Sequence, residues 1–221
     1  MSALKPSDHA LIAIKAALNA VPYVGGAVAS LIGDYVPLST QRSIDRTTKL
    51  LQERLTKLEG RLDAESVNKD EFSDLFKSCY LVVVRTTQEE KLRAAAAILA
   101  NLLLKPGDSE KASYTELDHF VRCLDALSVG AIAALGAARG IVQNANVRPD
   151  HHGDQSFSFE QLQRQFPQME PALLMGLVGE LNAFNLLRAE GRPSIPTSQY
   201  GNYPLSLTPL GSRLVQRFLE G

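Results

Sequence analysis

The chain of 221 residues has no tryptophan and only two cysteines, and 6% of its residues are aromatic. The two cysteines, Cys79 and Cys123, lie in apolar helical patterns, which predicts buried free thiols in a reducing cytoplasm rather than a disulfide or redox pair. The net charge of −1 provides no overall basic field that would attract nucleic acid. These shortages exclude a disulfide-rich secreted scaffold and a uniformly basic nucleic-acid binder.

The chain also lacks the local motifs of common catalytic sites. It has no phosphate-binding glycine loop, no zinc-ligand spacing and no G-x-S-x-G nucleophile elbow. Asp150, His151, His152 and Asp154 stand close together, but adjacent histidines in a polar loop point in different directions, which favours a solvated loop over a metal site. We therefore expect a protein that is not an enzyme and that has no catalytic residues, metal or cofactor.

No long uninterrupted apolar run is present either, and helical patterns dominate the first half of the chain. From Gln41 to Ala64 a heptad-like seam has charged flanks and consists of Ile44, Leu51, Leu55, Leu58 and Leu62. Its short length favours an antiparallel hairpin within the chain, with a long coiled coil as the alternative. Capping signals for further helices are Asn68 to Glu71, Thr87 to Glu90 and Ser113 to Glu116.

The second half changes character, since no lysine follows Lys111. A polar loop around 147–155 precedes a capping box from Ser158 to Gln161, and Pro171 suits the first position of the next helix. Two short apolar segments, 186–188 and 203–207, flank a loop rich in proline and glycine, and Thr208 caps a last helix. This order predicts a winged helix, with a plain helical continuation as the alternative.

The fold predicted is therefore mainly α, with an N-terminal helical bundle over 1–112 and a winged-helix-like domain over 113–221. The helix that would read DNA, from Pro171 to Leu187, has no lysine or arginine, contains Glu180, and offers only Asn182 and Asn185 to base edges. Contact with protein is thus favoured over nucleic acid.

Four arginines of the C-terminal half are the candidates for contact with nucleic acid or a partner: Arg188, Arg192, Arg213 and Arg217. Acidic residues slightly outnumber the arginines from Asn146 onward. Solvated or salt-bridged surface arginines are therefore the favoured interpretation of this set.

The N-terminal stretch VPYVGGAVASLIGDYVP, Val21 to Pro37, contains small residues that predict close helix packing: Gly25, Gly26, Ala29 and Gly33. Such spacing is typical of helix contacts in membranes but also occurs in soluble cores. The uncharged window from Ala16 to Gly33 has 18 residues, which is near the lower limit for a membrane span of about 20 residues. Pro22 interrupts this window. Two short helices, packed in the soluble fold or able to enter a bilayer, suit these residues better than a single span.

Taken together, this glycine-rich segment, the charged helical hairpin, the alanine-rich helices and the tail ending in LTPLG resemble the Abi-alpha family of bacterial abortive-infection proteins. The resemblance is one of layout and carries over no catalytic residue. It implies a role in defence against phage, by an effector action that can involve the membrane.

The leading hypothesis is a non-enzymatic defence effector with a membrane-active segment, Leu11 to Leu38, and a protein-contacting winged-helix-like tail. We expect it in the cytoplasm, membrane-associated on activation, with a protein partner or further copies of itself; a membrane surface is a second partner and nucleic acid a less favoured one. The alternatives are a winged-helix transcription regulator and a scaffold without activity of its own.

Overall fold

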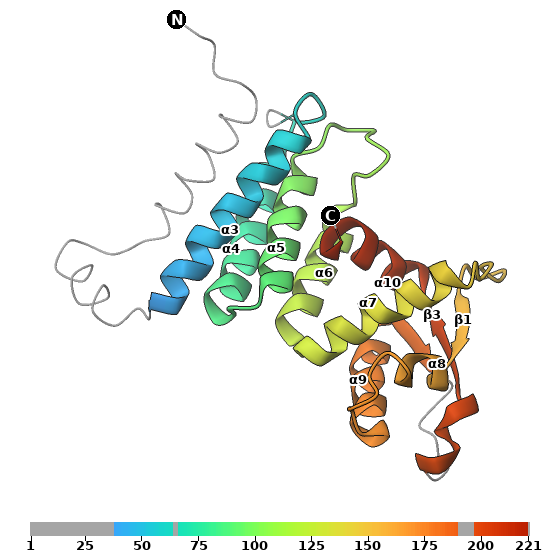
Figure 1. Cartoon of the computed structure of the whole chain (residues 1–221). Coiled ribbons are helices and arrows are strands. Elements are labelled where there is room, and N and C mark those ends of the chain that lie inside the picture. Colours follow the sequence, from blue (N-terminus) through green and yellow to red (C-terminus); the bar gives the residue numbers. More distant parts are fainter. Residues whose placement is uncertain (1–37, 64–65, 190–196, 221) are drawn as a thin grey trace, which may run out of the picture. The chain divides into compact units, whose positions relative to one another are not determined.

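The computed structural model describes residues 38–63, 66–189 and 197–220 (Figure 1). Within these residues the chain has eight α-helices and one small three-stranded antiparallel sheet, so the mainly α prediction is confirmed. The chain forms two compact units, Met1–Asp125 and Ala126–Gly221, here called the N-terminal unit and the C-terminal unit. None of the helices in the described residues combines the length and apolar character that a membrane crossing needs. The segment 21–37 lies outside them.

The N-terminal unit is built on three helices that lie side by side in Figure 1: α3 (Leu38–Lys57), α4 (Lys69–Arg85) and α5 (Glu89–Leu102). Leu51 and Leu55 of the predicted seam are buried, and α3 packs against α5 and α4 within the chain, as expected of a hairpin. The alanine-rich α5 is buried along most of its length, because its small side chains let both neighbours approach closely. The helix α6 (Tyr114–Ala126) follows.

The segment that follows α3 pairs with the segment that follows α5. The helix ends at Lys57 rather than near Ala64, since Gly60 adopts a φ of 89°, which L side chains rarely take. The chain then forms a bridge between Leu62 and Leu104, in which the Asp63 amide donates to the Leu103 carbonyl at 2.9 Å. We call the ion-pair group beside it, Arg61 with Asp108 and Glu110, the Arg61 clasp.

The helix starts show which capping signals were correct. Asn68 caps α4 and accepts hydrogen bonds from the amides of Asp70 and Glu71. Ser113 accepts from the Glu116 amide at 3.2 Å, as predicted. The capping box predicted from Thr87 is wrong: α5 is capped by Gln88, whose side chain makes no capping bond. The Thr86 hydroxyl instead accepts from the Gln88 amide at 3.2 Å.

The C-terminal unit begins with one long helix and alternates short strands with helices after it. In chain order its elements are α7 (Val129–Asn144), β1 (Gln155–Ser158), α8 (Phe159–Gln163), α9 (Pro171–Ala183), β2 (Leu187–Ala189), the 3₁₀ helix η1 (Thr197–Asn202), β3 (Pro204–Leu207), α10 (Pro209–Leu214) and the π-helical turn η2 (Val215–Leu219). The two predicted strands and the complete Ser158–Gln161 capping box are present. The strand β1 was not predicted.

The sheet has the order β1-β3-β2, with β3 antiparallel to both neighbours. Leu207 lies opposite Gln155 on one side and Leu187 on the other. Alternate residues of β3, Leu205 and Leu207, are fully buried, which is the period-two pattern of a strand with one covered face. In Figure 1 helices lie beside this sheet, and α7 contacts β1 and β3 while α9 contacts β2.

A tight junction holds α10 against the turn that follows α9. The Thr208 hydroxyl accepts from the Gly211 amide at 3.0 Å and lies 2.7 Å from the Asn185 carbonyl, to which it donates. At Gly211 a Cβ atom would stand 2.1 Å from the Leu186 carbonyl oxygen. Glycine is therefore required here by close backbone approach.

Candidate functional site

The candidate site that the structure describes best is the outer face of α9, the helix that sequence reasoning examined for DNA reading. Pro171 stands at its first turn, where the missing amide costs no hydrogen bond. Its inner face is fully apolar and consists of Leu174, Leu177, Val178 and Leu181. At Gly130 an added Cβ would lie 2.8 Å from the Leu177 side chain, so α7 and α9 pack with little space between them.

Glu180, the acid on this helix, has a structural partner. Its carboxylate accepts from the Ser128 amide at 2.9 Å and lies 3.1 Å from the Ser128 hydroxyl. Ser128 is the N-cap of α7, so an acidic side chain also sits at the positive end of that helix. The residue that weighed against DNA reading in the sequence thus anchors α9 to the start of α7.

The solvent-facing side of α9 is uncharged and nearly free of side-chain bulk. Four exposed residues at positions i, i+4, i+7 and i+11 make a strip, here called the α9 strip: Ala172, Gly176, Gly179 and Ala183. A Cβ added at Gly176 or Gly179 would meet no atom within 4 Å. Leu173, 56% exposed, stands next to the strip on the same helix. This surface offers close backbone approach and apolar contact.

A second exposed apolar side chain lies near the start of α7. Val129 is 46% exposed and follows Ser128, the residue bound by Glu180 of α9. Among the described residues, the large apolar side chains left exposed are Val129, Leu173 and Leu81 of the N-terminal unit. Two of the three therefore belong to the neighbourhood of α9.

The two asparagines considered as base readers serve the turn after α9. The Asn182 side-chain oxygen accepts from the Ala189 amide at 3.3 Å. Asn185 has a φ of 55°, the left-handed conformation that asparagine tolerates better than most residues. Asn182 therefore has only its amino group left to donate to a base edge.

The four candidate arginines are distributed over different elements. Arg188 in β2 forms an ion pair with Asp154, whose side chain is only 4% exposed. Arg213 lies in α10 and Arg217 in η2, and both are partly buried and engaged by other groups. Arg192 lies outside the described residues, as do Gly25, Gly26, Ala29 and Gly33.

The loop with two histidines is organised by Asp150. Its carboxylate accepts from the amides of His152 at 2.8 Å and Asp154 at 2.9 Å, and the Asp154 bond is the main reason why the pKa of Asp150 is lowered. The Asp154 side chain forms an ion pair with Arg188, so it does not share a set of metal ligands with the two histidines. In the described ranges no group of His, Cys, Asp and Glu is arranged to hold a metal ion.

The two cysteines are buried and free, as predicted. Burial raises the pKa of the Cys79 thiol far above its usual range and raises that of Cys123 to about 12. Both thiols stay protonated at neutral pH, and a thiolate is the form that acts as nucleophile or metal ligand. These side chains belong to the core of the N-terminal unit.

Sequence reasoning did not find the α9 strip as a surface, although the alternation of alanine and glycine along 172–183 was available as a signal. It also missed Asp154 as the partner of Arg188.

No protein-family model, no curated protein and no solved structure matches this chain.

Proposed function

We propose that this protein acts without catalysis, through protein contact, and that its C-terminal unit is a winged-helix-like contact domain. The order α7, β1, α8, α9, β2, β3 agrees with that of a winged helix, in which α9 would correspond to the reading helix and β2 and β3 to the strands of the wing. This order supports the prediction made for 113–221.

The observation that carries the proposal is the chemistry of the α9 strip. A helix that reads DNA presents donors to base edges and cations to phosphates. The strip presents neither: its four members are alanine or glycine, and the one ionisable residue of α9, Glu180, is bound to Ser128. An uncharged surface with so little bulk suits another helix, whose backbone can then approach closely.

The partner that we propose for this surface is a second copy of the same chain. In a two-fold pair each residue near the axis faces its own counterpart, so a charge there would repel itself. The α9 strip has no charge, and the apolar side chains of Leu173 and Val129 extend it beyond the four small residues. A stable interface needs about 800 Å² per partner. The four small residues do not provide this area alone, so the proposed interface includes the residues around them.

Sedimentation of the full chain tests the pairing. Gly176→Lys places a cation in the strip without a clash, since an added Cβ there meets nothing. Gly136→Lys on α7 is the matched control, because Gly136 has equally open surroundings and the substitution adds the same charge. We expect a dimer for the wild type and for Gly136→Lys, and a monomer for Gly176→Lys.

Two results would reject this partner: a wild type that sediments as a monomer at every concentration, or a Gly176→Lys variant that associates as the wild type does. A monomer that binds a different protein through the strip would keep the contact function and replace the partner. That outcome is recognised when Gly176→Lys, but not Gly136→Lys, loses the purified partner.

DNA binding is the second candidate function, and the element order is the observation that favours it. It predicts a duplex-DNA complex that weakens with salt and with replacement of Arg188, Arg192 and Arg213. The pairing of Arg188 with Asp154 reduces the charge that this arginine offers to a phosphate. Absence of any complex with duplex DNA at low salt would remove this candidate.

The defence role and the membrane activity of Leu11 to Leu38 are part of the same proposal and rest on the sequence. Those residues lie outside the described ranges, except for Leu38 itself. Release of dye from vesicles by the full chain tests the membrane action, and survival of phage-challenged cells that express the chain tests the defence role. If the full chain neither binds nor permeabilises vesicles, the membrane action is wrong.

A further inference from the structure

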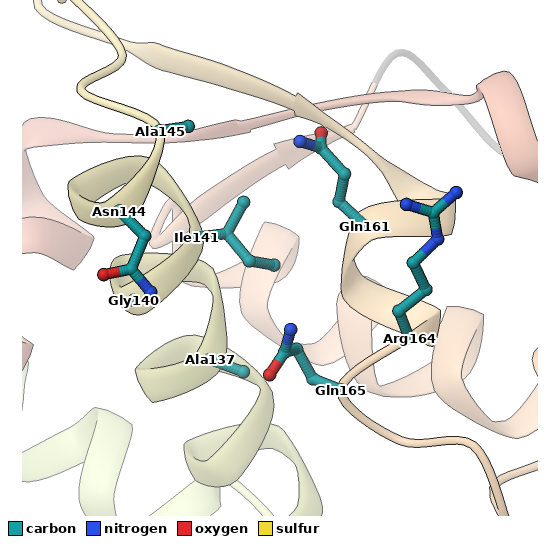
Figure 2. A pocket seen from close by; sticks show the side chains of 8 residues that line it. All are labelled: Ala137, Gly140, Ile141, Asn144, Ala145, Gln161, Arg164 and Gln165. Carbon is teal, nitrogen blue, oxygen red and sulfur yellow. The ribbon is translucent and has the colours of Figure 1, made fainter.

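A pocket of about 430 Å³ lies between α7 and α8 in the C-terminal unit (Figure 2). Its floor comes from α7 and consists of Ala137, Gly140 and Ile141. Its polar groups come from both sides: Asn144 at the end of α7, and Gln161, Arg164 and Gln165 in and after α8. The volume is within the range of small-molecule sites, which is about 300–1,000 Å³. None of these residues belongs to the α9 strip.

Three of the four polar side chains that line the pocket are carboxamides. Figure 2 shows Ile141, Gln161 and Gln165 directed into the space between the two helices, with Asn144 and Arg164 on its opposite sides. No carboxylate lines the pocket. A carboxamide presents a donor and an acceptor side by side, so three of them suit an uncharged ligand with both kinds of group.

The carboxamides differ in how far they are already engaged. Gln161 accepts from the Ser158 amide at 2.8 Å in the capping box, which fixes its orientation and leaves its amino group to donate. The side chains of Asn144 and Gln165 have no hydrogen-bond partner among the described residues, so each retains its donor and its acceptor. One oriented amino group and two complete carboxamides are therefore available to a ligand.

The arginine of the pocket does not add a net charge. Its guanidinium forms an ion pair with Glu160 at 2.7 Å, one turn earlier on α8. Both side chains of this pair are more than half exposed, so the pair lowers the net charge of the rim without blocking the guanidinium. A guanidinium held in this way still presents a flat face, on which a planar ring can stack.

The floor is flat at Gly140. A Cβ added there would meet no atom within 4 Å, so the space above this residue is open. Together with Ala137 and Ile141 it forms a small apolar surface of the kind that covers one side of a planar ring. The pocket therefore combines a flat apolar floor, an uncharged hydrogen-bonding rim and one planar cation that is already compensated.

We propose that this pocket binds the adenine base of a nucleoside. Asparagine and glutamine pair with adenine through its N6 donor and N7 acceptor, which is the two-point pattern that a free carboxamide offers. Guanine instead presents two adjacent acceptors, O6 and N7, which arginine serves best. The lining offers three carboxamides and one arginine, and this favours adenine over guanine.

Titration of the isotope-labelled full chain with adenosine, followed by amide chemical shifts, tests the proposal, with D-ribose as the comparison probe. We expect adenosine to produce saturable shifts at residues of the pocket and D-ribose to produce none. Absence of saturation with adenosine, or equal shifts with D-ribose, would overturn the proposal.

Two variants at glycines of α7 place the binding in the pocket. Gly140→Leu fills the open space above the floor, and Gly136→Leu makes the same change at a position that does not line the pocket. Both replace a helical glycine, which does not weaken the helix. We expect adenosine affinity to fall by about tenfold or more in Gly140→Leu and to stay unchanged in Gly136→Leu; equal affinities would overturn the proposal.

Gln165→Ala provides a measurement that does not depend on filling the pocket. Gln165 is exposed and its side chain makes no bond to other described residues, so its truncation leaves the fold intact. Adenosine affinity should fall by about fivefold, the effect of one hydrogen bond. An unchanged affinity would contradict the assignment of the rim.

Discussion

The two units of this chain differ in the ion pairs that join their distant segments. In the N-terminal unit ion pairs with exposed arginines join distant segments: Arg46 with Glu89, Arg85 with Asp125, and the Arg61 clasp, in which the Asp108 side chain is largely covered. Neutral side chains bind backbone groups in both units, as Ser43 does in the N-terminal unit and Thr208 in the C-terminal unit. Among the described residues of the C-terminal unit, the long-range ion pair has a buried acid, Asp154. Exposed ion pairs contribute little, about 0–1 kcal/mol each, and salt screens them.

The contacts of each unit indicate which substitutions should destabilise it. The N-terminal unit owes its stability to the leucine and alanine core around α5, so loss of a surface pair should be tolerated. The C-terminal unit also has an apolar core, and at Gly211 two of its backbone segments meet closely, so a single methyl group added there should matter. The following substitutions test this contrast.

The largest effect is expected for Gly211→Ala. The new Cβ would lie 2.1 Å from the Leu186 carbonyl oxygen, a backbone atom that can move only if the turn after α9 moves with it. We expect the C-terminal unit to lose about 3 kcal/mol of unfolding free energy. Hydrogen exchange of the β3 amides measures the loss within that unit.

Gly136→Ala is the control for this change, because an added Cβ there meets no atom within 4 Å. It should stabilise α7 by up to about 1 kcal/mol, the difference in helix propensity between the two residues. If both alanine variants exchange alike, the close contact at Gly211 does not limit the stability of the C-terminal unit.

A smaller loss is expected for Arg188→Ala. The Asp154 side chain, 4% exposed, would then lose the guanidinium with which it is paired. Loss of a charge-assisted hydrogen bond at such a site costs about 2 kcal/mol. Arg164→Ala, which breaks the exposed pair with Glu160, should cost at most about 0.5 kcal/mol. Urea unfolding of the two variants compares them, and equal losses would mean that the burial of Asp154 has no energetic consequence.

The parts of this fold that sequence reasoning predicted are those specified by neighbours in the chain. A capping box such as Ser158 with Gln161 depends on residues three positions apart, and Pro171 and Thr208 mark helix starts for equally local reasons. The capping box expected at Thr87 was wrong because tertiary contacts shifted the start of α5. The Thr86 carbonyl there accepts from the Ser43 hydroxyl of α3, 43 positions away.

The parts that were missed depend on pairing across the unit. The strand β1 has one buried residue, Phe157, between two serines, and its partner β3 lies about fifty positions later in the chain. The sequence indicated a polar loop residue at Asp154, because nothing nearby in the sequence shows that Arg188 lies beside it. The adenine pocket has no motif, since Asn144, Gln161 and Gln165 are ordinary surface residues until α7 and α8 meet.

The smallest effect is expected at the Arg61 clasp, and it depends on pH. Hydrogen bonds from Arg61, and next from the Glu110 amide, lower the pKa of Asp108 from 3.8 to about 2. A carboxyl whose pKa is lower in the folded state stabilises that state above its unfolded value of about 4. The stabilisation is then lost as the pH falls from about 4 to about 2. Carbon-13 titration of the Asp108 carboxyl should show a midpoint near 2 in the wild type and a higher one in Arg61→Gln. If the midpoint does not move between the two proteins, the clasp does not hold Asp108 in solution.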